Sequence, residues 1–407
     1  MNLPAHDMSR TTNERGAVLI QVAVALLALL ALSGFVFDYG VMWVSRGQAQ
    51  NAADAGALAG AISLAFDDPD DFDGARAKAL AVARRNNVWT AQPDVTDADV
   101  TFPPCPPGAP GAPDTCVKVD TFRNQRGGGN PLPTFFTKLV GILNQGVRAT
   151  ATAQVLIGDS ARCVKPWAVS DKWLDSRDNP QDNQWTADDV FERYVQNGNN
   201  RGALLSPADV YTPPGVAGHT GFTVEIDYGT RMVLKHGNPQ QAIAPGWFFP
   251  VVINPAEGPG GANYRDNIAS CDPTIIGPGT VLQTEPGNMV GPTSQGVAAL
   301  IAQDPGARWS AAANGGRGAP TGGCMAAGTC ALSPRLVALA MFNPDLYDSG
   351  RASGRTDIMV TKILGYWLEG MQGNDVIGYL THYPALAEGG GPVEDDATFL
   401  RTVILVR

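Results

Sequence analysis

The sequence has little of the chemistry on which enzymes depend. Its 407 residues include four histidines, none of them in the His-Glu-x-x-His pattern of a zinc protease. It also lacks a P-loop, a Gly-x-Ser-x-Gly elbow and a Cys-x-x-Cys pair, the motifs of ATPases, α/β-hydrolases, zinc ribbons and thioredoxin-like sites. We therefore expect a protein that is not an enzyme, with no cofactor and no small-molecule substrate.

Positive charge is scarce as well. Twenty-nine Lys and Arg residues stand against 39 Asp and Glu residues, which gives a formal net charge of −10. Nucleic-acid binding depends on clustered Lys and Arg at the phosphates, and no basic run of that kind is present. We expect no nucleic-acid partner.

Charged residues are also absent from residues 17–37, AVLIQVAVALLALLALSGFVF. About twenty apolar residues in a helix span a hydrocarbon core of ~30 Å. No proline follows before residue 66, so one helix over residues 15–66 would be about 75 Å long. A secretory signal cleaved near Ala31-Leu32-Ser33 is the alternative, but the length of the run and its continuation favour an uncleaved anchor.

The basic residues and the cysteines predict how the chain is oriented. Arg10 and Arg15 precede the apolar run and Arg46 follows it, so the positive-inside rule places the N-terminus in the cytoplasm. All six cysteines follow the run, which suits an oxidising compartment outside the cytoplasm. Two short Pro/Gly-bearing loops favour the pairs Cys105–Cys116 and Cys324–Cys330, which leaves Cys163–Cys271.

The remaining patterns predict an α+β protein in four parts. They are a cytoplasmic tail (1–15), a transmembrane and stalk helix (16–66), a pilin-like α+β domain (67–158) and a β-rich extracytoplasmic domain (159–407). Helices are expected at residues 75–87, 132–142 and 293–304, the last capped by Thr293 or Ser294. Strands are expected at residues 99–102, 117–122, 146–157, 223–226, 232–234, 248–253, 358–368, 376–381 and 398–406.

Four stretches carry a resemblance to a known family. They are ERGA at residues 14–17 with the apolar run and DYG at 38–40, QNAADAGALAGA at 50–61, PTFFTKLVG at 133–141 and VRATATA at 147–153. Over residues 14–158 the chain resembles the TadE/TadG-like proteins of bacterial Tad (tight adherence) systems, which assemble Flp pili. The Asp-x-Ser-x-Ser motif of the von Willebrand factor A domain that some TadG-like members carry is absent.

The resemblance implies a single-pass, pseudopilin-like protein of the bacterial inner membrane with its body in the periplasm. Its partners would be other pilin-like Tad membrane proteins. Processing after Gly16, as in prepilins, is a further alternative, although Gln21 stands where pilins usually have Glu. A membrane-anchored or exported adhesin is the alternative function. An extracytoplasmic hydrolase is a third possible function, but no set of catalytic residues in the sequence supports it.

A heptad seam follows the apolar run. Its members are Val41, Val44, Gln48, Asn51, Ala55, Leu58, Ile62 and Ala65. Gly56 and Gly60 add a small-xxx-small pair that lets two helix backbones approach closely. Packing against another pilin-like helix is expected for residues 41–50, whereas Leu58 and Ile62 are expected to pack on the protein's own small domain.

Acidic residues offer three more candidates. Asp38 ends the apolar run, and we expect it to mark the membrane interface in a solvated position rather than act as an intramembrane acid. Residues 67–73 lack the ligand order of an EF-hand and predict a helix break with an acidic N-cap. Asp175, Asp178, Asn179, Asp182 and Asn183 form a second oxygen-rich stretch, which we expect to be a solvated turn. A metal site is the alternative, and it fits this stretch better than residues 67–73.

Overall fold

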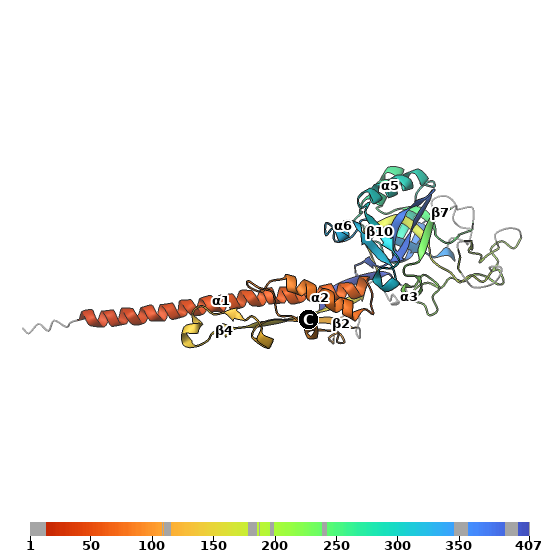
Figure 1. The fold of residues 1–407 in the computed structure, drawn as a ribbon. Coiled ribbons are helices and arrows are strands. Elements are labelled where there is room, and N and C mark those ends of the chain that lie inside the picture. Colours follow the sequence, from red (N-terminus) through yellow and green to blue (C-terminus); the bar gives the residue numbers. More distant parts are fainter. Residues whose placement is uncertain are drawn as a thin grey trace, which may run out of the picture.

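The molecule is a long rod that carries a bulky body at one end (Figure 1). The computed structural model describes residues 14–107, 109, 115–177, 185–186, 188–195, 199–237, 242–345, 357–386 and 398–406. We call the rod the stalk and the described part of residues 159–386 the head. The predicted order, a long apolar helix followed by a mixed α+β chain with a β-rich C-terminal part, is confirmed.

Helix α1 (Glu14–Phe66) forms the length of the stalk, and α2 (Phe72–Arg85) lies beside its second half. The acidic stretch between them ends the first helix and begins the second, because the Asp71 carboxylate accepts a hydrogen bond of 2.8 Å from the Gly74 N–H. This is the predicted helix break with an acidic N-cap. Arg84 and Arg85 occupy the last turn of α2, where positive charge favours the helix dipole.

A five-stranded sheet also packs on α1. Its order is β1-β2-β5-β16-β15, with β1 (Val100–Thr101), β2 (Cys116–Arg123), β5 (Val147–Ile157), β16 (Leu400–Val406) and β15 (Tyr383–Pro384). The alternating small residues of β5 turn one face toward α1, where Val147, Ala149, Ala151 and Ala153 are buried. The alternation that predicted this strand therefore also identifies its core face.

The C-terminal strand belongs to the stalk sheet. Residues 398–406 were predicted as a strand of the β-rich domain, but β16 pairs antiparallel with β5, with Val403 opposite Val155. Pairing partners depend on contacts between distant residues, which local alternation does not specify. The chain thus leaves the stalk through β5 and returns to it through the neighbouring strand.

Between β2 and β5 the chain forms a short irregular segment. Its elements are η2 (Arg126–Gly128), β3 (Leu132–Pro133), η3 (Thr137–Val140) and β4 (Asn144–Gln145). A further 3₁₀ turn, η1 (Asp97–Asp99), directly precedes β1. The helix predicted over residues 132–142 is wrong, because only a single 3₁₀ turn forms between the paired strands β3 and β4. Gly141, with φ 88°, ends that turn in the left-handed region.

The head is built on a closed ring of strands. They are β6 (Val164–Ser170), β7 (Arg231–His236), β8 (Trp247–Val252), β9 (Val281–Thr284), β12 (Leu336–Phe342), β13 (Asp357–Gln372) and β14 (Asp375–Thr381). The order is β12-β6-β8-β7-β14-β13-β9, and β12 also pairs with β13, which closes the ring. Closure leaves fewer free edges for another chain to join.

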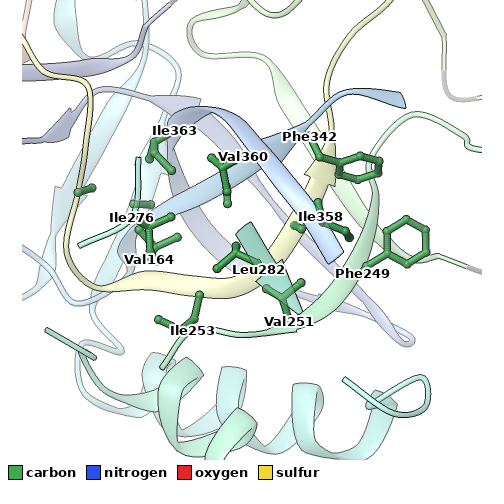
Figure 2. Close-up of a cluster of buried hydrophobic side chains, with 14 of the residues drawn as sticks. Val164, Phe249, Val251, Ile253, Ile276, Leu282, Phe342, Ile358, Val360 and Ile363 are labelled. Atoms are coloured by element: carbon green, nitrogen blue, oxygen red, sulfur yellow. The ribbon is translucent and has the colours of Figure 1, made fainter. Parts of the chain in front are cut away.

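Two buried clusters use opposite faces of the ring strands. Along β12, Ala338 and Ala340 belong to one cluster while Val337, Leu339 and Met341 belong to the other. Figure 2 shows the first cluster, in which Val164, Phe249, Leu282, Phe342 and Val360 converge from different strands. Because both faces are buried, β12 reads as a continuous apolar run without alternation, and sequence analysis did not identify it.

Helices cover part of the head. They are α3 (Val224–Asp227), α4 (Gly261–Ala269), α5 (Val290–Ala302) and α6 (Gly323–Ala326), with η4 (Asn314–Gly316) between the hairpin strands β10 (Ala307–Ser310) and β11 (Ala319–Gly322). The strand predicted at residues 223–226 is wrong: Thr223 caps α3 instead, its hydroxyl accepting from the Ile226 N–H and its own N–H donating to the Asp227 carboxylate.

Helix α5 begins earlier than predicted. Met289 stands at its N-cap, and Thr293 lies inside the first turns with its hydroxyl donating to the Met289 carbonyl over 2.8 Å. Pro292 fits the first turn because the N–H that proline lacks has no helical partner there. The predicted helix is therefore present, but neither Thr293 nor Ser294 caps it.

Three disulfides join the six cysteines in the expected pairs, Cys105–Cys116, Cys163–Cys271 and Cys324–Cys330. The first lies at the start of β2 in the stalk. The second joins the start of β6 to the chain after α4 and encloses the longest loop, with a sequence separation of 108. In the chain-entropy description this long closure restricts the unfolded head most strongly.

Candidate functional site

The first half of α1 contacts almost nothing else in the protein. From Val18 to Phe37 every residue except Gly34 is exposed. The helix is long and apolar enough to cross a membrane. An exposed apolar surface of this length marks a binding or membrane surface rather than ordinary protein surface.

The second half of α1 packs closely on the stalk's own domain through small residues. Gly56 and Gly60 face α2 and β2, and a Cβ at Gly60 would lie 2.8 Å from Val117 Cγ1 and 3.3 Å from Ala79 Cβ. Gly56 is equally confined, since a Cβ there would lie 3.0 Å from Ala83 Cβ. The structure thus places both glycines in the intramolecular interface, where their lack of a side chain permits the close approach.

Polar residues of the QNAADAGALAGA stretch also join α1 to the sheet. The Gln50 side-chain amide donates to Asp54 and to the Thr150 carbonyl of β5. The Thr121 hydroxyl on β2 donates to the Ala49 carbonyl over 2.9 Å in a buried position. These bonds fix the rotation of α1 against its own sheet, and therefore decide which of its faces stays open.

The heptad seam lies only partly outside that interface, so the open packing surface expected over residues 41–50 is incomplete. Val44 and Ile62 are each 49% exposed, and Asn51 is exposed as well. Gln48, Ala55 and Leu58 are partly buried, Gln48 accepting the Trp89 N–H, while Val41 and Ala65 are buried. Leu58 packs against the buried cluster of the stalk as expected, whereas Ile62 does not. Much of the buried face of α1 runs through positions one residue after the seam, about 100° around the helix.

The N-terminal helix carries the deciding comparison. Residues 16–63 match the Tad family model. The model is described as "Putative Flp pilus-assembly TadE/G-like", and the match lies entirely within α1. It confirms the resemblance for this segment, which we call the Tad segment. Comparisons of the chain with curated proteins and with solved structures gave no significant match.

Within the Tad segment, Asp38 is not solvated as predicted. Its side chain is 2% exposed, and its carboxylate accepts hydrogen bonds from the backbone N–H groups of Phe135 (2.8 Å), Phe136 (3.0 Å) and Thr137 (2.7 Å). Three backbone donors replace water around the charge, which stabilises a buried carboxylate. Sequence reasoning missed this contact because almost a hundred residues separate the partners.

The two acidic stretches do not form a metal site among the described residues. In the first, Asp67 forms an ion pair with Lys78, and Asp68 lies 3.6 Å from the Arg317 guanidinium of the head. Of the second stretch, Asp175 is described and buried, whereas Asp178, Asn179, Asp182 and Asn183 lie outside the described residues.

Asp175 is instead part of a buried pair of carboxyl groups with Asp209. The pKa of Asp209 is raised to about 6, mainly by burial and in part by the nearby Asp175, although the N–H groups of Ser176 and Glu192 donate to Asp209 and act in the opposite direction. A carboxyl group in this environment titrates in a mildly acidic range. Its direct effect is on the pH dependence of folding rather than on a reaction.

Proposed function

We propose that the chain is a bitopic, pseudopilin-like component of a Tad/Flp pilus-assembly system in a bacterial inner membrane. A general role in pilus assembly is supported by the Tad match, and the family points to a structural rather than an enzymatic protein. The finer proposal is that residues 1–15 are cytoplasmic and that the first half of α1 spans the membrane. Two domains would then lie in the periplasm: residues 67–158 together with the C-terminal strand β16, and the head.

The observation that carries the proposal is the open seam on the Tad segment. Val44, Asn51 and Ile62 remain exposed on the face turned away from the small domain, and Gly47 lies nearby with no atom within 4 Å of the position of a Cβ. Partner helices pack through such a stripe of apolar and small residues, and the polar Asn51 can select the register of the pair. The partners we propose are other pilin-like Tad membrane proteins.

The geometry also sets the distance at which the head would work. The helix continues for 29 residues beyond Phe37, which is about 44 Å at the rise of an α-helix. Strands β5 and β16 then join the stalk to the head. With the head at that distance from the membrane, residues 38–66 of α1 lie between the two and remain accessible to neighbouring stalks.

Association can be tested by placing charge on the seam. In the doubly substituted variant Val44→Lys and Ile62→Lys, the protein should no longer co-purify with the Tad membrane proteins of its host after cross-linking in intact cells. Ile226→Lys is the matched control, since Ile226 is 72% exposed on the head. Limited proteolysis of the head should be unchanged in both variants. Undiminished cross-linking of the seam variant would remove the main support for the proposal.

The state of the N-terminus decides between the anchor and its alternatives. The intact mass and N-terminal sequence of the membrane-isolated protein should begin at Met1 for a permanent anchor. A start at Ala17 would indicate prepilin-type processing. A start near Gly34 would mean that the protein is released, and the adhesin alternative would then replace the bitopic proposal, especially if the head proved accessible on intact cells.

A further inference from the structure

The segment between β3 and β4 is a compact loop held against α1. Residues 132–145 are closed at the base by the pairs Leu132–Gln145 and Pro133–Asn144. Across the loop, the Thr134 hydroxyl contacts the carbonyl oxygens of Ile142 and Leu143 at 2.8 Å and 2.9 Å. In Figure 1 this loop, next to the β4 label, lies along α1 on the side remote from the head.

The loop exposes large apolar side chains and carries almost no charge. Phe135, Phe136, Ile142 and Leu143 are 39%, 41%, 52% and 70% exposed, respectively. Lys138 is the only charged residue among residues 132–145. Four large apolar side chains gathered on one loop are unusual for a surface that faces water.

The loop lies level with the end of the apolar run. Phe136 packs directly on Gly34, where a Cβ would come within 2.4 Å of Phe136 Cβ. The ring of Phe37 lies 5.3 Å from that of Phe135 and 6.0 Å from that of Phe136. The last turn of the apolar run and the two phenylalanines of the loop therefore form one continuous apolar surface.

Two exposed aromatic residues that follow on α1 independently indicate that the membrane–water interface lies close to Phe37. Tyr39 and Trp43 are 47% and 67% exposed and lie next to each other, with ring centroids 6.3 Å apart. Exposed Tyr and Trp favour the membrane–water interface. The twenty residues from Val18 to Phe37 span about 30 Å, the thickness of a hydrocarbon core. If the run crosses the membrane, Phe37 therefore lies at its head-side boundary.

We infer that residues 132–145 insert Phe135, Phe136, Ile142 and Leu143 into the head-side leaflet of the membrane that α1 crosses. The inference rests on the proposed bitopic anchor and adds a second, shallow contact with lipid. The ammonium of Lys138 can extend from this apolar surface to the lipid phosphates, as Lys side chains do at interfaces. We choose lipid over a partner helix because the surface continues that of the spanning segment and ends at an aromatic belt.

Asp38 gives the loop its fixed position. Its carboxylate holds the backbone of residues 135–137, and the Gln145 side-chain amide donates to the Asp38 carbonyl over 3.2 Å. Two contacts with the bilayer on one rigid body restrict the tilt of the stalk more than a single helix does. Asp38 is thus a positioning residue whose role depends on the loop it holds.

Depth-dependent fluorescence quenching tests the inference on the full-length protein in lipid nanodiscs. A single added cysteine, carrying an environment-sensitive fluorophore, replaces Leu143 in one variant, Leu27 in the second and Ile62 in the third. Brominated acyl chains should quench the label at position 143 several-fold more than the label at 62, and the label at 27 should be quenched as well. Aqueous iodide should show the reverse order.

The three labels separate the possible failures. Quenching at 27 without quenching at 143 overturns the loop inference and leaves the anchor standing. Absence of quenching at 27 overturns the bitopic proposal, and the loop inference falls with it. If 143 is quenched in nanodiscs but cross-links to another protein and is shielded from lipid in native membranes, the loop is a docking surface for a partner and the inference is wrong.

Asp38→Asn supplies a second variant that changes the position of the loop. The loss of the charge weakens three hydrogen bonds, so lipid quenching at 143 should fall while quenching at 27 remains. Asp54→Asn is the matched control, because Asp54 accepts from Gln50 on the same helix without touching the loop. Equal quenching at 143 in both variants would mean that Asp38 does not position the loop.

Discussion

In the stalk, the buried cluster consists mainly of alanine and valine, whereas the two clusters of the head bury tryptophan, tyrosine and phenylalanine. The stalk achieves burial by bringing backbones close together, as at Gly56 and Gly60. The head achieves it by filling space with large side chains such as Trp167 and Tyr366, both 0% exposed. The two regions should therefore respond in opposite ways to changes of side-chain size.

Buried ion pairs distinguish the regions further. The head contains a buried ion pair between Lys362 and Asp171, 3.1 Å apart, with side chains 2% and 0% exposed. In the stalk, most ion pairs have at least one largely exposed partner, as in Lys78–Asp67. A buried pair is costly to disrupt, and an exposed one contributes little. We therefore expect mutations that remove a buried side-chain group to destabilise the head, and mutations that enlarge a side chain to destabilise the stalk.

The largest effect is expected from breaking the buried pair in the head. Lys362→Met should lower the free energy of unfolding by about 3–5 kcal/mol, because it leaves the Asp171 carboxylate buried without its counter-charge. Tyr211 and the Phe222 N–H still donate to Asp171 and keep the side chain in place. Chemical denaturation followed by tryptophan fluorescence measures the loss, since six of the eight tryptophans lie between residues 167 and 367.

Two further variants are controls for the pair. Lys78→Met removes an ammonium group that is 54% exposed and should cost less than about 1 kcal/mol. Combining Lys362→Met with Asp171→Asn removes the unpaired charge and should recover part of the loss. A loss below about 1 kcal/mol for Lys362→Met alone would contradict the contrast between the regions.

The stalk should be most sensitive to enlargement at the close approach. Gly60→Leu forces a side chain against Val117 and Ala79 and should destabilise the stalk by about 1–3 kcal/mol. Gly47→Leu is the matched control on the same helix, where nothing lies within 4 Å, and it should preserve or raise stability because Leu favours helix more than Gly does. Loss of helical circular dichroism on heating measures both; equal midpoints would show that α2 and β2 yield to the larger side chain.

The carboxyl pair in the head predicts a pH-dependent difference. The pKa of Asp209 is raised to about 6, above its usual value of 3.8. Its protonation therefore stabilises the head below pH ~4, and this contribution is lost as the pH rises through about 6. In Asp175→Asn the neighbouring charge is replaced by an amide that can donate to Asp209. The variant should gain stability relative to the parent as the pH rises from 4 to 7, by at most about 2 kcal/mol.

The difference in unfolding free energy between Asp175→Asn and the parent at each pH isolates the effect of Asp175 on Asp209. Burial lowers the pKa of His382 to about 3, so that residue stabilises the head increasingly as the pH rises from about 3 to 6.5, opposite to Asp209. Because His382 is present in both proteins, its contribution cancels in the difference. Asp266→Asn, at an exposed position of α4, is the control and should show no such trend. Parallel stability curves for Asp175→Asn and the parent would disprove the coupling.

Local patterns predict the elements of this fold better than their contacts. The apolar run and the absence of proline predicted α1, and alternation predicted β2 and β5. The C-terminal strands β13, β14 and β16 were also predicted. Strands β6 and β12, which are buried on both faces, carry no alternation and were missed. The partner of β16 was also missed, because a strand's sequence does not state which distant strand it joins.

At the candidate site, too, the sequence predicted the elements but not the contacts between them. The seam was recognised from spacing, but α1 has small or apolar residues on nearly every side between residues 41 and 65, so periodicity could not decide which stripe faces the small domain. The hydrogen bonds of Gln50 and Thr121 decide it. Asp38 was noticed as an acid at the end of an apolar run, but its three backbone donors arrive from a loop almost a hundred residues away.

The smallest effect is expected at the junction between the two regions. The Arg317 guanidinium lies 3.6 Å from Asp68 at the end of the first stalk helix and 4.8 Å from the Tyr228 ring centroid in the head. Arg317→Gln should cost less than about 1 kcal/mol, because the pair is partly exposed and strands β5 and β16 join the regions independently. Tryptophan fluorescence follows unfolding of the head, and circular dichroism follows unfolding of the stalk. The difference between the two unfolding midpoints should be the same in the variant, in the parent and in the exposed-pair control Arg265→Gln. If the two transitions separate only in Arg317→Gln, this side-chain contact rather than the shared sheet couples the stalk to the head.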